Sequence, residues 1–239
     1  RSFREQGRWK TVLNALNPGD FVFIQFGHND RDNSKAERYT PVDKYKLYID
    51  SFVVEAREKG AIPVLVSPMV MNAWKNSDMR NVFTESGNDY RGAMATVAKN
   101  RGCAFVDLNM KSYNYFRQFD SEYLSRYYYN CYSAGEYNNY PSGSSDGTHF
   151  QEMGAMAMCR FITEGLREIE DPYICSLQSY LKPLYKVTVK ANKDKIGTIT
   201  QSNTFPEGCP VSVKVLPSTG NKFLSWNRDG KDVAKTNIY

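Results

Sequence analysis

The chain has 239 residues, of which 41% are hydrophobic and 24% are charged. These proportions lie near the average of globular proteins and exclude a disordered, collagen-like or coiled-coil chain. The length is sufficient for one large core, or for a core with a small additional domain. No apolar run approaches 18 residues, so the sequence offers no candidate transmembrane helix.

The net charge of +5 is concentrated in the last quarter of the chain. Residues 1–183 contain 22 Lys and Arg against 22 Asp and Glu, whereas residues 184–239 contain 9 against 4. A basic region can bind nucleic acid or an acidic polymer. Here the cations are spread out and never cluster, so we expect no nucleic-acid partner.

The five cysteines, at positions 103, 131, 159, 175 and 209, form no C-x-x-C pair and have no neighbouring histidine. This pattern excludes a zinc ribbon and a thioredoxin-type motif.

The beginning of the chain predicts a helix followed by a buried strand. Residues 21–26 are almost continuously apolar, as expected when helices cover both faces of a strand in a parallel sheet. Residues 17–20 carry the turn chemistry that separates this strand from the helix. The helix itself is indicated by apolar residues at helical spacing, namely Trp9, Val12, Leu13 and Leu16.

The alternation of helices and strands continues. A second helix is predicted to have Thr40 as its N-cap, Pro41 at its first position and Gly60 after its end. Such alternation predicts a parallel sheet between two helical layers, so the fold class is α/β. The remaining elements are predicted as strands at residues 62–66 and 103–107 and helices at roughly residues 88–99 and 151–167.

Three predicted strands are fewer than the roughly five that such sheets usually contain. The first residues also include neither an initiator Met nor an apolar signal segment. We therefore expect the sequence to begin part-way through a longer gene product, with the first strands upstream of Arg1.

After Pro183 the chain changes to short alternating segments separated by Gly, Pro and Asn, which predict β-strands without helices. We therefore divide the chain into an α/β domain, residues 1–183, and a small β domain, residues 184–239. The second domain reaches Tyr239 without a predicted closing strand, so we expect it to be incomplete.

The two histidines of the chain both lie in polar, turn-rich segments. His28 belongs to a turn from Gly27 through Asn29 to Asp30, at the carboxyl end of a predicted parallel strand, where open α/β sheets bind ligands. The Asn29 amide could donate a hydrogen bond to a developing oxyanion. The alternative is an ordinary turn, because Asn and Asp both favour Asx-turns.

His149 allows two interpretations. In the first, Thr148 caps the following helix and Gln151 completes a capping box, so that the histidine is incidental. In the second, Asp146 accepts a hydrogen bond from Nδ1–H of His149 across a glycine, which leaves Nε2 free to act as a general base.

Together these motifs resemble the SGNH (GDSL-type) hydrolases, and within them the rhamnogalacturonan acetylesterase-like group. The matching segments are residues 1–9 (RSFREQGRW), 26–30 (FGHND), 135–141 (GEYNNYP) and 146–150 (DGTHF), and the resemblance covers about residues 1–170. It implies a flavodoxin-like three-layer α/β/α sandwich that needs no metal or other cofactor. It also implies an oxyanion-hole role for Asn29 and a catalytic base, His149, that Asp146 orients, with Gly27, His28 and Asp30 as the supporting turn.

In this family the nucleophilic serine follows the first strand, and an oxyanion-hole glycine lies just before the segment that residues 1–3 match. Neither position is in this sequence, and no serine here, including Ser2 and Ser67, occupies the nucleophile's motif. The resemblance therefore implies an additional N-terminal segment that carries both groups.

Nine of the seventeen tyrosines lie between residues 113 and 140. Aromatic rings stack on sugar rings, so this stretch could line a polysaccharide groove, with Tyr137 and Tyr140 as candidate contacts. The alternative is that these tyrosines cover an edge of the core.

The C-terminal β region is similar to the small β repeats of bacterial cell-surface proteins. This similarity suggests an accessory module that contacts a cell surface or a glycan.

These observations predict a serine esterase that removes O-acetyl groups from a pectic or related plant polysaccharide, with its serine supplied upstream. The resemblance implies that it is secreted, periplasmic or on the cell surface. Two alternatives stay open. One is a non-catalytic protein whose basic β domain binds carbohydrate or mediates adhesion. The other is a metal-dependent hydrolase, for which two imidazoles and two carboxylates are available: His28, Asp30, Asp146 and His149.

Overall fold

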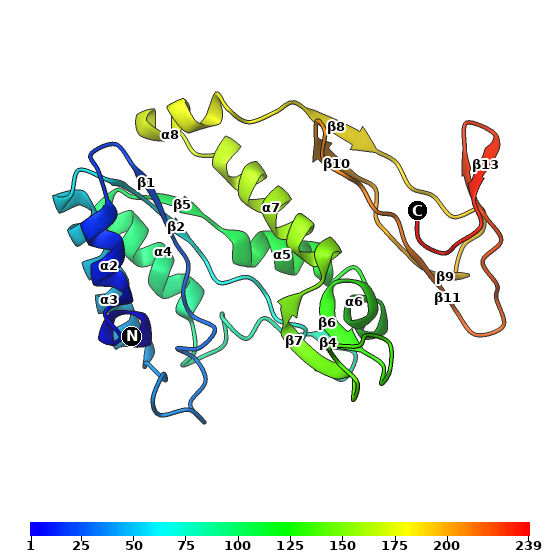
Figure 1. The fold of residues 1–239 in the computed structure, drawn as a ribbon, viewed down its shortest axis with the longest axis horizontal. Coiled ribbons are helices and arrows are strands. Elements are labelled where there is room, and N and C mark those ends of the chain that lie inside the picture. Colours follow the sequence, from blue (N-terminus) through cyan, green and yellow to red (C-terminus); the bar gives the residue numbers. More distant parts are fainter. The chain divides into compact units, whose positions relative to one another are not determined.

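The computed structural model describes all residues from 1 to 239. The chain forms two compact units. The chain passes between the units several times, once inside helix α7 (Glu152–Arg167), which Figure 1 labels. No helix has the length and apolar character required of a membrane span. Unit 1 consists of Arg1–Ala73, Arg80–Tyr115 and Phe161–Tyr180, and unit 2 of Trp74–Met79, Phe116–Arg160 and Leu181–Tyr239.

Unit 1 is built on three parallel strands in the order β1-β2-β5. They are β1 (Phe21–Ile24), β2 (Ile62–Val66) and β5 (Ala104–Val106). The predicted parallel α/β arrangement is confirmed. The helices of this unit are α1 (Ser2–Glu5), α2 (Arg8–Ala15), α3 (Val42–Glu58), α4 (Tyr90–Arg101), α5 (Leu108–Phe116), the end of α7, and α8 (Pro172–Gln178).

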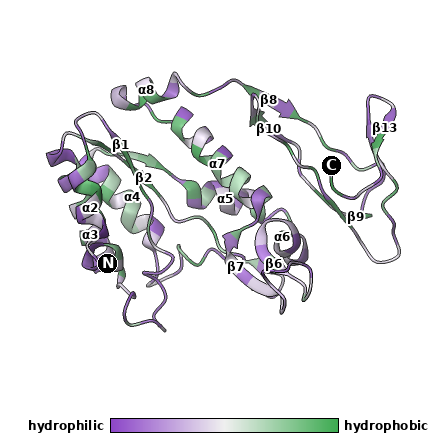
Figure 2. Ribbon diagram, viewed as in Figure 1, coloured by the Kyte–Doolittle hydropathy of each residue, from purple (hydrophilic) through white to green (hydrophobic).

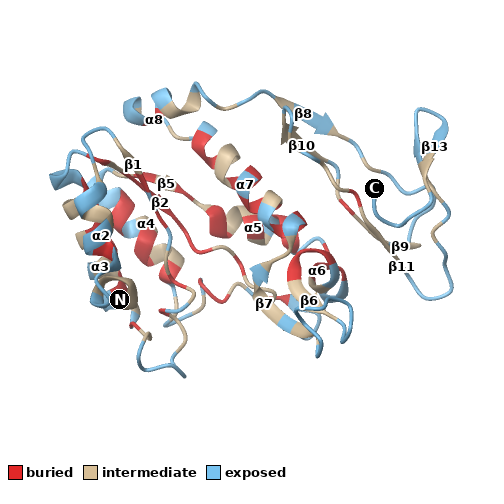
Figure 3. Ribbon diagram, viewed as in Figure 1, coloured by how far each residue is buried: buried red, intermediate tan, exposed pale blue.

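Alternate strand residues of the sheet face two different layers. Leu65 lies opposite Ile24, and both belong to a buried cluster with residues of α2, α3 and α4. The other face of the sheet is buried at Val64 and Val106, and Gly165 of α7 lies against Val106. Figures 2 and 3 show the apolar and buried residues gathered on β2 and its neighbours.

Strand β1 is buried on one face only. Val22 and Ile24 are buried, whereas Phe23 between them is 45% exposed. The prediction that both faces of this strand are covered was wrong, because β1 pairs only with β2 and forms an edge of the sheet. The central strand β2 has no exposed residue.

Helix α3 begins one residue later than predicted. Pro41 has φ −52° and ψ 149° and is itself the N-cap, so Thr40 lies outside the helix. The Thr40 hydroxyl donates to the carbonyl of Arg38 at 3.2 Å instead of capping. Gly60 has a left-handed backbone (φ 73°), and its N–H donates to the carbonyl of Arg57, so it ends the helix as predicted.

The centre of unit 2 is an antiparallel hairpin of β6 (Tyr129–Tyr132) and β7 (Ser144–Phe150). Helix α6 (Ser121–Tyr127) comes directly before it in the chain. A short hairpin of β3 (Trp74–Lys75) and β4 (Asp78–Met79) also belongs to this unit.

The C-terminal region contains three antiparallel pairs and no helix, which confirms the predicted short strands. Its last residues also pair, since Lys214 forms an antiparallel bridge with Ile238, and Val213 and Tyr239 exchange two backbone hydrogen bonds. The three pairs are β8 (Leu184–Val187) with β10 (Asn203–Pro206), β9 (Gly197–Ile199) with β11 (Val215–Pro217), and β12 (Trp226–Arg228) with β13 (Lys231–Ala234).

Gly165 allows α7 to approach β5 closely. A Cβ added there would lie 2.6 Å from Cγ1 of Val106, well inside van der Waals contact. Replacing Gly by Ala in a helix normally gains about 1 kcal/mol. We expect Gly165→Ala to destabilise unit 1 by about 1–3 kcal/mol instead, because the fully buried Val106 has little room to move.

Denaturant unfolding measures this change. Asn100→Ala, on the exposed surface of α4, is the control and should alter stability by less than about 0.7 kcal/mol. A Gly165→Ala protein as stable as the parent would contradict the close packing.

Candidate functional site

The segment after β1 forms a tight turn in unit 1. Gly27 has φ +134°, and a Cβ at this position would lie 3.0 Å from Cγ of Pro68. The backbone conformation and the close approach therefore both require glycine. The N–H of Arg31 donates to the carbonyl of Gly27 at 3.0 Å and closes the turn.

His28 is tied to the loop that follows β2. Its Nε2 lies 3.0 Å from the carbonyl oxygen of Met69, and since a carbonyl can only accept, Nε2 is the donor in this contact. The imidazole also packs edge-to-face on Phe83, with ring centroids 4.8 Å apart. These contacts hold the turn against its neighbours.

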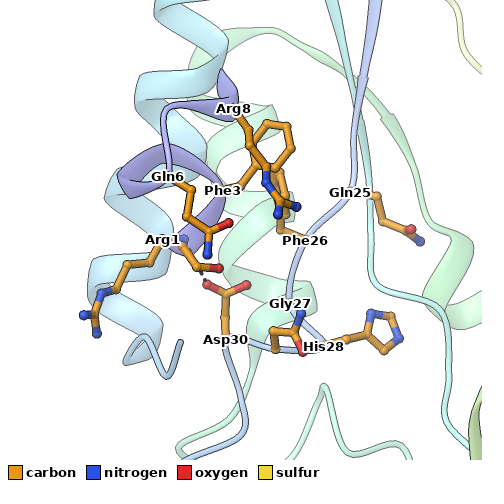
Figure 4. Close-up of a pocket in the computed structure, with 11 residues that line it drawn as sticks. Arg1, Phe3, Gln6, Arg8, Gln25, Phe26, Gly27, His28 and Asp30 are labelled. Carbon is orange, nitrogen blue, oxygen red and sulfur yellow. Dashed lines mark hydrogen bonds and ion pairs between the residues drawn. The ribbon is translucent and has the colours of Figure 1, made fainter. Parts of the chain in front are cut away.

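Asp30 is 5% exposed and has polar partners around it. Its Oδ1 lies 3.3 Å from the backbone nitrogen of Arg1 (Figure 4). Its backbone carbonyl accepts hydrogen bonds from the Tyr90 hydroxyl at 3.1 Å and from the N–H of Thr40 at 2.9 Å. Burial, together with the nearby Tyr39 and Asp30, raises the pKa of Tyr90 to about 12, so this hydroxyl stays protonated as a donor.

A pocket of about 260 Å³ opens beside this turn. Asn29 lies at its edge with an exposed side chain that makes no hydrogen bond within the chain, so its amide is available to a ligand. Figure 4 shows side chains of the first two helices and of the turn around this space. The lining residues are Arg1, Ser2, Phe3, Gln6, Arg8 and residues 25–30.

Asp146 and His149 form a hydrogen-bonded pair at the end of β7 in unit 2. Nδ1 of His149 lies 2.6 Å from Oδ2 of Asp146. The other carboxylate oxygen accepts the backbone N–H groups of Thr148 at 2.8 Å and His149 at 3.1 Å. The predicted contact between the carboxylate and Nδ1 is therefore present, while its catalytic role stays a prediction.

The carboxylate of this pair is held in its ionised form. Partial burial pushes the pKa of Asp146 upward, but the hydrogen bonds from the His149 ring and from two backbone N–H groups outweigh it. The pKa of Asp146 is therefore below its usual range. The His149 side chain is 74% exposed, so its Nε2 is accessible for proton transfer.

The capping-box interpretation of this segment was wrong. Thr148 lies inside strand β7, and α7 begins only at Glu152. Gln151 instead donates its side-chain amide to the carbonyls of Tyr129 at 2.6 Å and Arg126 at 3.0 Å. Sequence reasoning missed this role of Gln151, although the same T-x-x-Q pattern had marked the residue for a local cap.

The predicted site residues fall into two sets. Asp146 and His149 belong to unit 2, whereas residues 27–30, with His28, Asn29 and Asp30, belong to unit 1. The structure brings the members of each set together within their own unit. No group of three or more His, Cys, Asp or Glu side chains is arranged to hold a metal ion.

The tyrosine-rich stretch divides into buried and exposed members. Tyr137 and Tyr140 are 49% and 42% exposed and lie at the two ends of one turn. Their ring centroids are 4.5 Å and 5.1 Å from that of Tyr132, so the three rings form one aromatic cluster. The core-covering alternative holds for the buried tyrosines, which are Tyr115, Tyr123, Tyr127, Tyr128 and Tyr129.

Ser67 is also a buried structural group. Its hydroxyl donates to Oδ1 of Asp107 at 3.0 Å and accepts the N–H of Asn109 at 2.9 Å. The Asp107 carboxylate is paired with the guanidinium of Arg91. This network links the ends of β2 and β5 to helix α4. The only carboxylate bonded to Ser67 is that of Asp107, and because it is paired with Arg91, it is not available as a general base for this hydroxyl.

A parallel α/β sheet with a polar turn at the carboxyl end of a strand is typical of α/β enzymes, and an Asp–His pair recurs in hydrolases. The family model described as "GDSL-like Lipase/Acylhydrolase family" matches residues 1–155. The chain belongs to this family, as the sequence motifs predicted. A second model, "Divergent InlB B-repeat domain", matches residues 187–238 and confirms the predicted similarity to bacterial repeats.

Two relatives from Bacillus subtilis (strain 168) match most of the chain. The probable rhamnogalacturonan acetylesterase YesY is 33% identical over 173 residues, which cover 72% of this chain and 73% of YesY. The rhamnogalacturonan acetylesterase RhgT is 33% identical over 177 residues, which cover 72% of this chain and 71% of RhgT. The crystal structure of the B. subtilis protein YxiM matches with a TM-score of 0.52 at 22% identity, covering 70% of this chain and 42% of that chain, and supports the fold.

The lowered pKa of Asp146 predicts a pH-dependent contribution to stability. The ionised carboxylate stabilises the hairpin above the usual Asp pKa of about 3.9, and this contribution is lost as the pH falls through the lower value of the folded state. Asp146→Asn should therefore unfold more easily than the parent between about pH 5 and 8, by less than about 1 kcal/mol for this partly exposed pair. The difference should shrink below about pH 4.

Denaturant unfolding across this pH range measures the effect. Asp194→Asn, at an exposed site, should show no such pH dependence. A stability difference for Asp146→Asn that persists unchanged at pH 2.5 would show that the carboxylate charge is not its cause.

Proposed function

We propose that this protein is a serine esterase that removes O-acetyl groups from a pectic or related plant polysaccharide. The observation that carries the proposal is the Asp146–His149 hydrogen bond of 2.6 Å in a chain of the acylhydrolase family. The substrate class is supported by the 33% identity to two proteins named as rhamnogalacturonan acetylesterases.

In the proposed reaction, Asp146 accepts the Nδ1 proton of His149 in a hydrogen bond, and Nε2 removes the proton of the serine hydroxyl. The serine oxygen attacks the acetyl carbonyl, while the Asp146 carboxylate stabilises the imidazolium. Nε2 then returns the proton to the sugar oxygen, which leaves as an alcohol. Water attacks the acyl-enzyme in the same way and releases acetate.

The Asn29 amide is proposed to donate a hydrogen bond to the oxyanion of both tetrahedral intermediates. Its exposed, unengaged side chain on a turn fixed by Gly27 and His28 supports this role. One such donor typically stabilises the transition state by about 2.7–4 kcal/mol.

The nucleophilic serine is proposed to lie in a segment N-terminal to Arg1. We further propose that this segment adds strands to the sheet beside β1 and completes a flavodoxin-like three-layer sandwich. The open edge of β1, an apolar strand on which Phe23 is 45% exposed, supports this arrangement, because proteins normally cover or pair such an edge.

The aromatic cluster of Tyr132, Tyr137 and Tyr140 is proposed to bind a sugar ring of the polymer. In the β6–β7 hairpin, Tyr132 pairs with Ser144 and Asn130 with Asp146. Directly opposed residues and residues two apart share a face, so Tyr132 and Asp146 lie on the same face. At about 3.3 Å per residue, the cluster begins roughly 7 Å from the carboxylate along the strand, about the length of one sugar unit.

We propose that the protein acts outside the cytoplasm, whether secreted, periplasmic or on the cell surface, where a polysaccharide substrate is found. We also propose residues 1–183 as the hydrolase domain and residues 184–239 as an accessory module that contacts a glycan or a cell surface. The match of residues 187–238 to a divergent InlB B-repeat supports the latter.

His149→Ala should remove nearly all release of acetate from acetylated pectic oligosaccharides by the full-length protein, because no other group replaces the general base. Thermal unfolding should change little, since the side chain is 74% exposed. Asp194→Ala, at an exposed position in the module, is the control and should keep the parent rate.

A His149→Ala protein that keeps a tenth or more of the parent rate would contradict the mechanism. Treatment with EDTA tests the metal-dependent alternative, and we expect it to leave the rate unchanged.

Tyr137→Ala and Tyr140→Ala should each raise KM for an acetylated oligosaccharide by about two- to tenfold, since stacking on an aromatic ring contributes roughly 0.5–1.5 kcal/mol. Their kcat/KM for a small aryl acetate should stay unchanged, because that substrate does not reach the cluster. Tyr180→Ala, at an 81% exposed tyrosine of unit 1, is the matched control. An unchanged KM for the oligosaccharide in both variants would exclude the cluster from substrate binding.

A further inference from the structure

Helix α6 presents two buried tyrosines to the C-terminal strands of unit 2. Tyr123 is fully buried, and Tyr127 is 3% exposed. The Tyr123 hydroxyl donates to the carbonyl of Lys214 at 3.0 Å and lies 2.8 Å from Oγ1 of Thr200. Oγ1 of Thr200 also accepts the N–H of Lys214 at 2.9 Å. Tyr123 is thus inserted where the β9–β11 ladder ends.

Further contacts surround this point. The Tyr127 hydroxyl donates to the carbonyl of Val215 at 3.2 Å and accepts the side-chain amide of Asn237 at 3.2 Å. The Lys214 ammonium lies 5.0 Å from the centroid of the Tyr127 ring. The Thr198 hydroxyl donates to the carboxylate of Asp120, the N-cap residue of α6. The polar groups on this face of α6 are therefore paired with the C-terminal strands.

Few residues of the C-terminal strands are buried. Between residues 181 and 239, only Thr200 and Val213 are buried. Isolated two-stranded hairpins are marginally stable in water, and a small domain needs a core or another support. For these strands the support is α6, together with Arg160 of α7, whose guanidinium lies 5.5 Å from the ring centroid of Phe205.

The carboxyl end of α6 is in turn fixed to the hairpin that carries the Asp–His pair. Gln151, two residues after His149, donates its side-chain amide to the carbonyls of Arg126 and Tyr129. Its backbone N–H donates to the carbonyl of Tyr128 at 2.9 Å. A displacement of α6 would therefore be transmitted directly to the end of β7.

We infer that the C-terminal module, residues 184–239, is a structural support of the catalytic hairpin: by docking on α6 through Tyr123 and Tyr127, it fixes β6, β7 and the Asp146–His149 pair. Tyr123 is a positioning residue in this arrangement. This role is additional to any contact of the module with a glycan or a cell surface. Only its consequence for turnover rests on the proposed function.

Hydrogen exchange followed by mass spectrometry tests the inference without requiring activity. Tyr123→Phe keeps the ring but removes the hydrogen bonds that its hydroxyl makes to the Thr200 hydroxyl and the Lys214 carbonyl, which then keep only their bonds to each other. We expect exchange of the amides in residues 129–132 and 144–151 to become about tenfold faster, together with those in residues 197–200 and 213–217. Amides of β1, β2 and β5 in unit 1 should be unchanged and provide an internal reference.

Tyr185→Phe is the matched control, because Tyr185 is a module tyrosine that is 56% exposed. Tyr127→Phe is a second, milder variant in case Tyr123→Phe fails to fold. If exchange accelerates in the module while the hairpin keeps its parent rates, the module is a passive attachment and the inference is overturned. If exchange accelerates equally in unit 1, the effect is global unfolding, and the inference is overturned as well.

In the full-length esterase, Tyr123→Phe should lower kcat for a soluble acetyl ester several-fold with KM little changed, because the variant disturbs the Asp–His pair and not the substrate contacts. Faster hairpin exchange without any esterase activity in the parent protein would contradict the proposed function alone. An unchanged kcat in an active protein would show that the support does not extend to His149.

Discussion

The need to pair buried polar groups shapes both candidate catalytic segments. In unit 1, Nε2 of His28 is satisfied by the carbonyl of Met69 and the Tyr90 hydroxyl by the carbonyl of Asp30, so the turn is fixed to elements distant in sequence. In unit 2, the Gln151 amide satisfies carbonyls at the end of α6. The first two pairings hold the backbone beside Asn29, and the third holds the backbone beside His149. The side chains of Asn29 and His149 themselves are exposed.

Where a feature depends on a few neighbouring residues, the sequence was sufficient to predict it. The bounds of β2 follow from a short apolar run after Gly60, and the Asp146–His149 hydrogen bond follows from a spacing of three residues across a glycine. The failures depend on distant partners. Phe23 is exposed because of the place of β1 in the sheet, and Gln151 bonds to α6 instead of capping its own helix.

The tyrosines illustrate the same limit. Residues 113–140 concentrate one side-chain type, and nothing local distinguishes Tyr123, which is fully buried, from Tyr137, which is 49% exposed. The difference arises from tertiary structure: Tyr123 faces strands that lie about 80 residues later, whereas Tyr137 sits at a hairpin turn. The alternative that these tyrosines cover an edge of the core therefore holds for the buried majority, while sugar binding by the exposed pair stays a prediction.

The scarcity of buried residues in the C-terminal region gives the α6 contacts their energetic importance. A domain that buries only Thr200 and Val213 gains little hydrophobic stabilisation of its own, so the free energy that orders its strands has to come from the surface on which it docks. Coupling of this kind is reciprocal, because a contact that orders the strands stabilises α6 to the same extent. Helix α6 is followed directly by β6, and its Arg126 carbonyl accepts a hydrogen bond from Gln151, two residues after His149. The stabilisation of α6 therefore reaches the Asp146–His149 pair through the chain itself and through these hydrogen bonds.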